Sequence, residues 1–158
     1  MAGLLARAGR RPAPGPRPEY GDDYYGAFLL DPDGNSAEAV HHGSLRRGGH
    51  VDHLWIRVAD VAAAKRFYAT VAPVAGFELR SDVPERGQFA GDSGSFSVVA
   101  GNEPTRNLHL AFAAGEDATV DAFHRTAIAA GYHGNGALGE RLDVGASRDA
   151  RICVATER

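Results

Sequence analysis

Cysteine is nearly absent from this chain, which has one, Cys153, among 158 residues. A single thiol can form neither an intramolecular disulfide nor a thiolate metal cage, so disulfide scaffolds and zinc fingers are excluded. Long apolar runs are also lacking: no stretch approaches the ~18 residues of a spanning helix, and the N-terminal GLLA is too short for a signal peptide. We therefore expect a cytoplasmic protein with no membrane partner.

A strong charge of either sign is missing too, because 17 Lys and Arg against 20 Asp and Glu give a net charge of -3. Four arginines lie among the prolines of residues 1–18, which we interpret as a flexible Pro/Arg-rich tail. The rest of the chain is acidic and has no basic stripe, so we expect no nucleic-acid partner. A hydrophobic content of 44% is that of a globular protein, and the length suits one domain over residues 19–158.

The first ordered element is expected to be a hairpin over residues 19–42. It consists of the strand YYGAFLL, the Gly-containing turn DPDGNS and the returning strand AEAVHH. The Gly-rich segment GSLRRGG, residues 43–49, follows as a linker.

Residues 50–101 predict a strand, a helix and three further strands. HLWIRV forms the first strand, Asp60 caps the helix, and Pro73 is expected to stop it. The buried helix face is formed by Val61, Ala64, Phe67, Tyr68 and Val71. GFELR, GQFAG and SFSVVAG follow as short strands between glycines and Pro84.

Residues 107–158 begin in the same way, with the strand LHLAFAA and a helix that Thr119 can cap. Gly131 is expected at the residue after the helix C-cap. The predicted buried face of this helix is Val120, Phe123, Ala127 and Ile128. RICVAT, residues 151–156, can form a further strand.

The two passages repeat each other. His53 and His109 each begin a strand–helix passage, and the helices end in Ala75-Gly76-Phe77 and Ala130-Gly131-Tyr132. A period of about 56 residues inside one domain indicates an internally duplicated βαβββ unit. Equivalent positions of such a pair converge near a pseudo-twofold axis, so His53 and His109 can face a shared cleft.

Two imidazoles and one carboxylate together form a facial triad of ligands for a divalent metal, and Glu38 is the candidate carboxylate. It is the one carboxylate of its strand, and alternation turns Ala37 and Ala39 to the opposite face. Two simpler interpretations of these residues are also open. A strand histidine is more often a hydrogen-bonded structural residue than a ligand, and Glu38 could lie on a solvated edge.

These motifs resemble the vicinal oxygen chelate superfamily, which includes glyoxalase I, bleomycin-resistance proteins, fosfomycin-resistance transferases and extradiol dioxygenases. The resemblance rests on HVDHLWIRVADVAAAKRFYATV, SFSVVAG, NLHLAF and YYGAFLLDPDGNSAEAV, within residues 20–139. It implies an α+β fold in which paired βαβββ modules form an open mixed β-barrel. It also implies that His53, His109 and Glu38 hold a divalent metal such as Mn, Fe, Zn or Ni.

The chain departs from the family pattern at two points. At the fourth strand, where glyoxalase I has a further ligand, it offers only Phe96 to Val99, a pattern closer to the fosfomycin-resistance and extradiol branches. The closing hairpin precedes the first strand instead of following the second helix. A circular permutation, a hairpin swapped onto a second chain of a homodimer, and the remnant of a lost upstream domain all fit this order.

The resemblance implies a metal-dependent lyase, dioxygenase or transferase that acts on a small substrate with vicinal oxygens. No general acid or base is identifiable. The alternative is a non-catalytic binding protein of the bleomycin-resistance type that sequesters a small aromatic or hydrophobic ligand. Trp55, Phe96 and Phe112 are the candidate substrate-binding residues, although such aromatics are commonly core residues.

Overall fold

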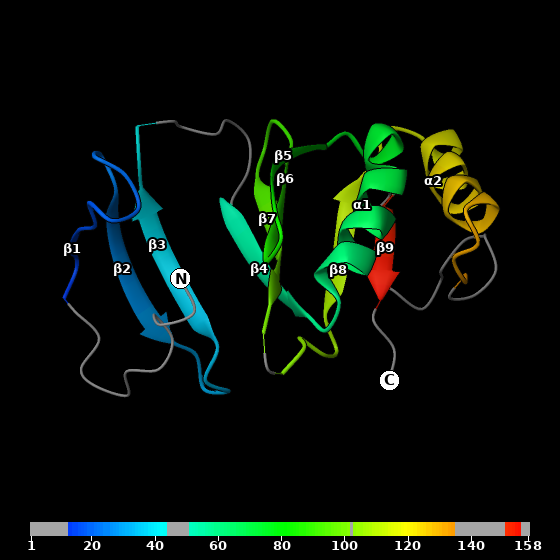
Figure 1. Cartoon of the computed structure of the whole chain (residues 1–158). Helices are drawn as coiled ribbons and strands as arrows, with labels where there is room; N and C mark the ends of the chain where they lie inside the picture. The colour runs from blue at the N-terminus through cyan, green and yellow to red at the C-terminus, as the bar shows by residue number, and fades with distance from the viewer. Residues whose placement is uncertain (1–12, 44–50, 102, 135–150, 156–158) are drawn as a thin grey trace. The chain divides into compact units, whose positions relative to one another are not determined.

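The computed structural model describes residues 13–43, 51–101, 103–134 and 151–155, the last of these as backbone (Figure 1). The chain is of the α+β class and divides into two compact units, Met1–Arg47 and Gly48–Arg158. Most of the predicted tail 1–18 and of the predicted linker 43–49 lies outside the described residues. Neither of the two described helices is long and apolar enough to cross a membrane.

Three antiparallel strands form the sheet of the first unit, in the order β1-β2-β3. They are β1 (Gly15–Pro16), β2 (Tyr25–Leu30) and β3 (Ser36–His41). The hairpin predicted within residues 19–42 is therefore present. The predicted flexible tail includes Gly15 and Pro16, but the structure pairs both with β2. An edge strand tolerates Pro16, because its missing N–H is not needed on the open side.

The turn between β2 and β3 is held by one carboxylate. Asp31 Oδ1 accepts hydrogen bonds from the backbone N–H groups of Asn35 (2.7 Å) and Asp33 (3.0 Å), and Asp31 Oδ2 accepts one from Asn35 Nδ2 (2.8 Å). Gly34 has a φ of 85°, which a residue without Cβ adopts at no steric cost. These contacts lower the pKa of Asp31, with the Asn35 side chain as the largest cause.

The second unit begins with the βαβββ module predicted from residues 50–101. Its elements are β4 (His53–Val58), α1 (Val61–Ala75), β5 (Glu78–Val83), β6 (Arg86–Ala90) and β7 (Ser95–Ala100). The strands form one sheet in the order β4-β7-β6-β5, in which β4 and β7 are parallel and the other pairs antiparallel.

Helix α1 begins as predicted, because Asp60 Oδ1 accepts a hydrogen bond from the N–H of Ala63 at 2.8 Å. The expectation that Pro73 stops the helix is wrong, since α1 continues to Ala75. Pro73 lies in the last turn, where its missing N–H costs only one intrahelical bond and the buried Val71 and Ala72 hold the helix on the sheet. The helix ends at Gly76, which adopts a φ of 73°.

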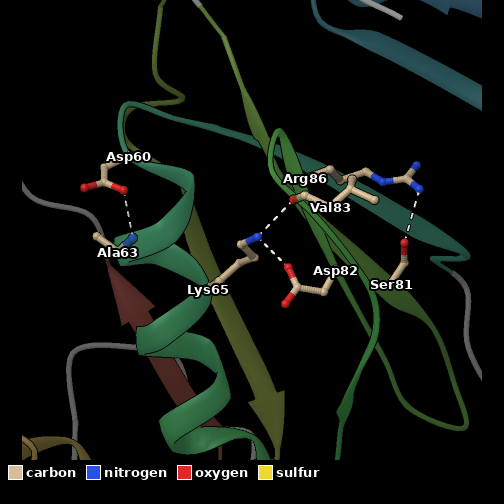
Figure 2. Close-up of polar contacts among 7 residues, drawn as sticks. All are labelled: Asp60, Ala63, Lys65, Ser81, Asp82, Val83 and Arg86. Atoms are coloured by element: carbon tan, nitrogen blue, oxygen red, sulfur yellow. Dashed lines mark hydrogen bonds and ion pairs between the residues drawn. The ribbon is translucent and has the colours of Figure 1, made fainter.

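A polar contact ties α1 to the β5–β6 hairpin. Lys65 Nζ donates hydrogen bonds to Asp82 Oδ1 and, at 2.9 Å, to the backbone carbonyl of Val83 (Figure 2). A Cβ at Gly87 would come within 2.6 Å of the Lys65 stem, so this glycine makes room for it. Only 16% of the Lys65 side chain is exposed.

The repeated passage contains β8 (His109–Ala113), α2 (Asp117–Ala129) and β9 (Arg151–Ala155). The predicted strand within residues 151–156 is confirmed, and it pairs with β8 antiparallel, whereas β7 runs parallel to β4. Within the described residues the second βαβββ module is thus incomplete and no barrel closes.

Two details of α2 differ from expectation. Its N-cap is Glu116, not Thr119, and the acidic Asp117 lies in the first turn, where the helix dipole favours negative charge. Phe123 is buried as predicted, but Ile128 is exposed because it lies about 100° around the helix from the half-buried Ala127. Gly131, with a φ of 89°, follows the C-cap Ala130 as predicted.

An aromatic core joins the two passages of the second unit. Phe96 lies 5.2 Å from Phe89 and 5.7 Å from Phe112 between ring centroids, and Phe112 lies 4.8 Å from Phe77. Tyr68 of α1 packs on the same cluster. The core therefore lies between α1, α2 and one face of the β4–β7 sheet.

Candidate functional site

The two faces of the β4–β7 sheet differ in chemistry. Ile56, Phe89, Phe96 and Val98 belong to the core beneath α1. Because successive strand residues alternate between faces, the residues between them point the opposite way. We call this opposite side the polar face. The strand register arranges its residues in three rows, each of which crosses β4, β7, β6 and β5 in that order. The rows are His53-Ser95-Ala90-Glu78, Trp55-Ser97-Gln88-Ser81 and Arg57-Val99-Arg86-Val83.

His53 begins β4 at one end of the polar face, and its neighbour Asp52 orients it. The Nδ1 atom of His53 and the Oδ1 atom of Asp52 lie 2.9 Å apart, and both side chains are partly buried. The backbone carbonyl of Asp52 accepts a hydrogen bond from the N–H of Ser95 at 2.9 Å, which fixes Asp52 against β7. A neutral imidazole that donates Nδ1–H to a carboxylate carries its lone pair on Nε2.

His109 begins β8 in the same way that His53 begins β4. Leu108, Leu110 and Phe112 pack against the core, whereas His109, Ala111 and Ala113 are exposed. The structure thus places both histidines at the start of equivalent strands and on the side that faces away from the core.

Glu38 lies in β3 of the first unit, opposite Phe28 of β2. It is partly buried while Ala37 and Ala39 are exposed, in agreement with the predicted alternation. The Tyr24 hydroxyl donates a hydrogen bond to Glu38 Oε1 at 2.7 Å. A Cβ at Gly26 would lie 2.9 Å from the same oxygen, so the glycine leaves the space that the carboxylate occupies.

Aromatic rings pack against Tyr24, the hydrogen-bond partner of this carboxylate. Tyr24 packs edge-on against Tyr20, with 5.1 Å between ring centroids, and stacks on His42 at 6.1 Å. Burial, then the charges of Glu19 and Glu38, raise the pKa of Tyr20. The bond between Tyr24 and Glu38 had no sequence signal, because the two residues meet only through the β2–β3 register.

The three predicted ligands divide between the units: Glu38 belongs to the first, and His53 and His109 belong to the second. In the described parts of the chain, no group of three or more His, Cys, Asp and Glu side chains could hold a metal ion. The His-His-Glu set therefore stays a prediction. Its donor chemistry fits a divalent transition metal, and the Asp52–His53 pair is the type of contact that orients an imidazole ligand.

The candidate substrate-binding residues separate into two groups. Phe96 is buried in the core and Phe112 packs against it, which supports the interpretation of these rings as structural. Trp55 is 56% exposed and lies in the middle row of the polar face. Of the three, Trp55 is the one that can meet a ligand there.

Comparison with known proteins finds a likeness among solved structures. No family model and no curated protein matches the chain. Among solved structures, the chain is similar to a glyoxalase/bleomycin resistance protein from Albidiferax ferrireducens, with 23% identity and a TM-score of 0.42. The similarity covers 49% of this chain and 69% of that one.

Proposed function

We propose that this protein is a metal-dependent enzyme of the glyoxalase/dioxygenase superfamily that acts on a small substrate with vicinal oxygens. His53, His109 and Glu38 would hold the metal. The observation that carries the proposal is the equivalence of the two histidines, each of which begins a duplicated strand and lies on the side away from the core.

Neighbouring side chains orient two of the three proposed ligands, His53 and Glu38. Asp52 Oδ1 lies 2.9 Å from His53 Nδ1, and the Tyr24 hydroxyl donates a hydrogen bond to Glu38 Oε1; contacts of this kind orient metal ligands in proteins. A bound Mn, Fe, Zn or Ni ion would act as a Lewis acid toward two substrate oxygens and leave positions for them.

Metal content tests the proposal directly. The full chain, purified without chelator, is expected to contain one divalent ion per His-His-Glu site, and His53→Ala, His109→Ala and Glu38→Gln are each expected to lose it. His133→Ala is the matched control, because His133 is exposed and follows α2. A metal-free chain that also fails to bind added Mn²⁺, or unchanged metal content in all three variants, would contradict the proposal.

A non-catalytic binding protein is the second candidate, and the exposed Trp55 on the polar face favours it. Such a protein needs no metal ligands. Tight binding of a small aromatic ligand by the chelator-treated chain, unchanged in His53→Ala and His109→Ala, would support this function over the enzyme.

We further propose that the protein forms a homodimer in which the first unit docks on a second copy. Every buried hydrophobic side chain of the described residues lies in the second unit, and a three-stranded sheet without a packed apolar face is marginally stable. Size-exclusion chromatography with light scattering on the full chain tests this. A monomer that retains its structure would support docking within one chain instead.

A further inference from the structure

Two arginines occupy the row of the polar face farthest from His53. Arg57 of β4 and Arg86 of β6 both align with Val99 of the strand between them, β7. Since adjacent strands lie about 4.8 Å apart, the two Cα atoms are separated by roughly 10 Å, with an apolar residue between. Arginine side chains are long enough for guanidinium groups in this arrangement to contact one anion together.

The charges of these arginines are not neutralised within the described residues. Neither guanidinium has a carboxylate partner there, unlike Lys65 with Asp82 and Arg80 with Glu78. Arg86 Nη2 donates only a long hydrogen bond of 3.4 Å to Ser81 Oγ (Figure 2), and Arg57 is bonded through its backbone N–H to Thr105 Oγ1. The other members of this row, Val99 and Val83, carry no charge.

The middle row connects this positive end of the face to His53. It contains the exposed Trp55, the partly buried Gln88 and Ser81, and the buried Ser97, so the apolar surface of Trp55 lies beside the hydrogen-bonding side chains of Gln88 and Ser81. Binding sites combine apolar surface with a few polar groups in this way. His53 and Arg57 are four residues apart on one strand, or about 13 Å.

We propose that the polar face binds an elongated small molecule with an anionic group at one end. Arg57 and Arg86 hold that group, a carboxylate or a phosphate, Trp55 packs against the middle of the molecule, and its oxygen-bearing end reaches His53. This assignment deepens the proposed function, on which the His53 end rests, because it narrows the substrate class to organic acids or phosphates.

Trp55 is the only tryptophan of the chain, so its fluorescence reports binding at the middle row. The full chain is treated with chelator and titrated with 3-(3,4-dihydroxyphenyl)propanoate and with the uncharged amide of the same compound. The acid is expected to bind about tenfold or more tightly than the amide, since a hydrogen bond to a charged group is worth that much. Inorganic phosphate is then added as a competitor of the acid. Strong competition indicates that the natural ligand ends in a phosphate, and weak competition indicates that it ends in a carboxylate. Both results support the anion site.

Three variants test whether Arg57 and Arg86 hold the anionic group. Arg57→Gln and Arg86→Gln are each expected to remove most of the preference for the acid and to leave the affinity for the amide unchanged. Arg66→Gln is the matched control, because it removes the same charge from the exposed side of α1. Thermal unfolding by circular dichroism verifies that each variant is folded.

The proposal is overturned if acid and amide bind equally, if neither probe binds, or if Arg66→Gln weakens acid binding as much as the other two variants. Failure of the proposed metal site gives a different result. In that case added Mn²⁺ leaves the affinity for both probes unchanged, while the preference for the acid in chelator-treated protein, and its dependence on Arg57 and Arg86, persist.

Discussion

The Nδ1 atom of His53 lies 2.9 Å from Oδ1 of Asp52, the residue directly before it in the chain. A side chain at the start of a strand seldom meets that of its immediate neighbour, because the two point to opposite faces. Here Asp52 precedes the strand, and the bond from Ser95 N–H to the Asp52 carbonyl holds it beside the imidazole. The carboxylate therefore selects the protonated nitrogen of His53.

Asp52→Asn is expected to lower the affinity of the chain for divalent metal about 10- to 100-fold, the usual cost of losing a partner that orients a ligand. Isothermal titration with Mn²⁺ or Zn²⁺ measures this. Asp92→Asn, in the exposed turn between β6 and β7, is the control and should bind like the unmodified chain. Equal affinities of the two variants would show that Asp52 has no role in metal binding.

Tyr24→Phe removes the hydroxyl that holds Glu38 Oε1 at 2.7 Å. We expect metal affinity to fall about tenfold or more, because the carboxylate is no longer fixed, and stability to fall by about 1 kcal/mol. Titration with Mn²⁺ and urea unfolding measure the two effects. The control Tyr25→Phe alters an exposed neighbour and is expected to change neither metal affinity nor stability. If Tyr24→Phe left the metal affinity unchanged, the hydrogen bond to Glu38 would have no role in metal binding.

The first module was predictable from sequence because its signals are local: Asp60 as a cap, apolar residues at helical spacing, and glycines between short strands. Strand alternation also puts Trp55 on the same side as His53 and Ile56 on the other. Register is not local, however. The rows that place Arg57 and Arg86 on either side of Val99, and the meeting of Tyr24 with Glu38, depend on how separate strands pair.

Pro73 shows why a correct local rule can fail. Proline disfavours a helix interior, but burial of Val71 and Ala72 outweighs one missing bond in the last turn. The second passage could be predicted only as far as α2, since nothing in RICVAT indicates that β9 runs antiparallel to β8.

Lys65→Met is expected to destabilise the protein by about 1 kcal/mol, because it leaves the Val83 carbonyl without its donor, whereas water can solvate the exposed Asp82 carboxylate. Urea unfolding measures the change. The control Arg80→Gln breaks the exposed contact with Glu78 and should cost well under 1 kcal/mol. If both variants had the same stability as the unmodified chain, the Lys65 contact would not hold α1 to the β5–β6 hairpin.

Acid is expected to weaken the β2–β3 turn. Because the folded-state pKa of Asp31 is lowered, its ionised form stabilises the hairpin above the ordinary pKa of 3.8, and this stabilisation is lost as the pH falls through the lowered value. NMR titration of the Asp31 carboxyl should give a midpoint below 3.8. Asn35→Ala removes the hydrogen bond that contributes most to the lowered pKa of Asp31, so the midpoint should rise toward 3.8 in this variant. A midpoint of 3.8 in the unmodified chain would contradict the turn geometry.

Phe96 and Trp55 are both candidates for ligand binding, but replacing each by Ala is expected to have opposite effects on stability and on ligand binding. Phe96→Ala should destabilise the protein by about 3–5 kcal/mol, because it empties the centre of the aromatic core. Trp55→Ala removes an exposed ring and should change stability little, but it should weaken binding of the dihydroxyphenyl probes, measured by isothermal titration because the fluorophore is lost. Large destabilisation by Trp55→Ala with unchanged probe affinity would make Trp55 a packing residue and leave the polar face without its apolar contact.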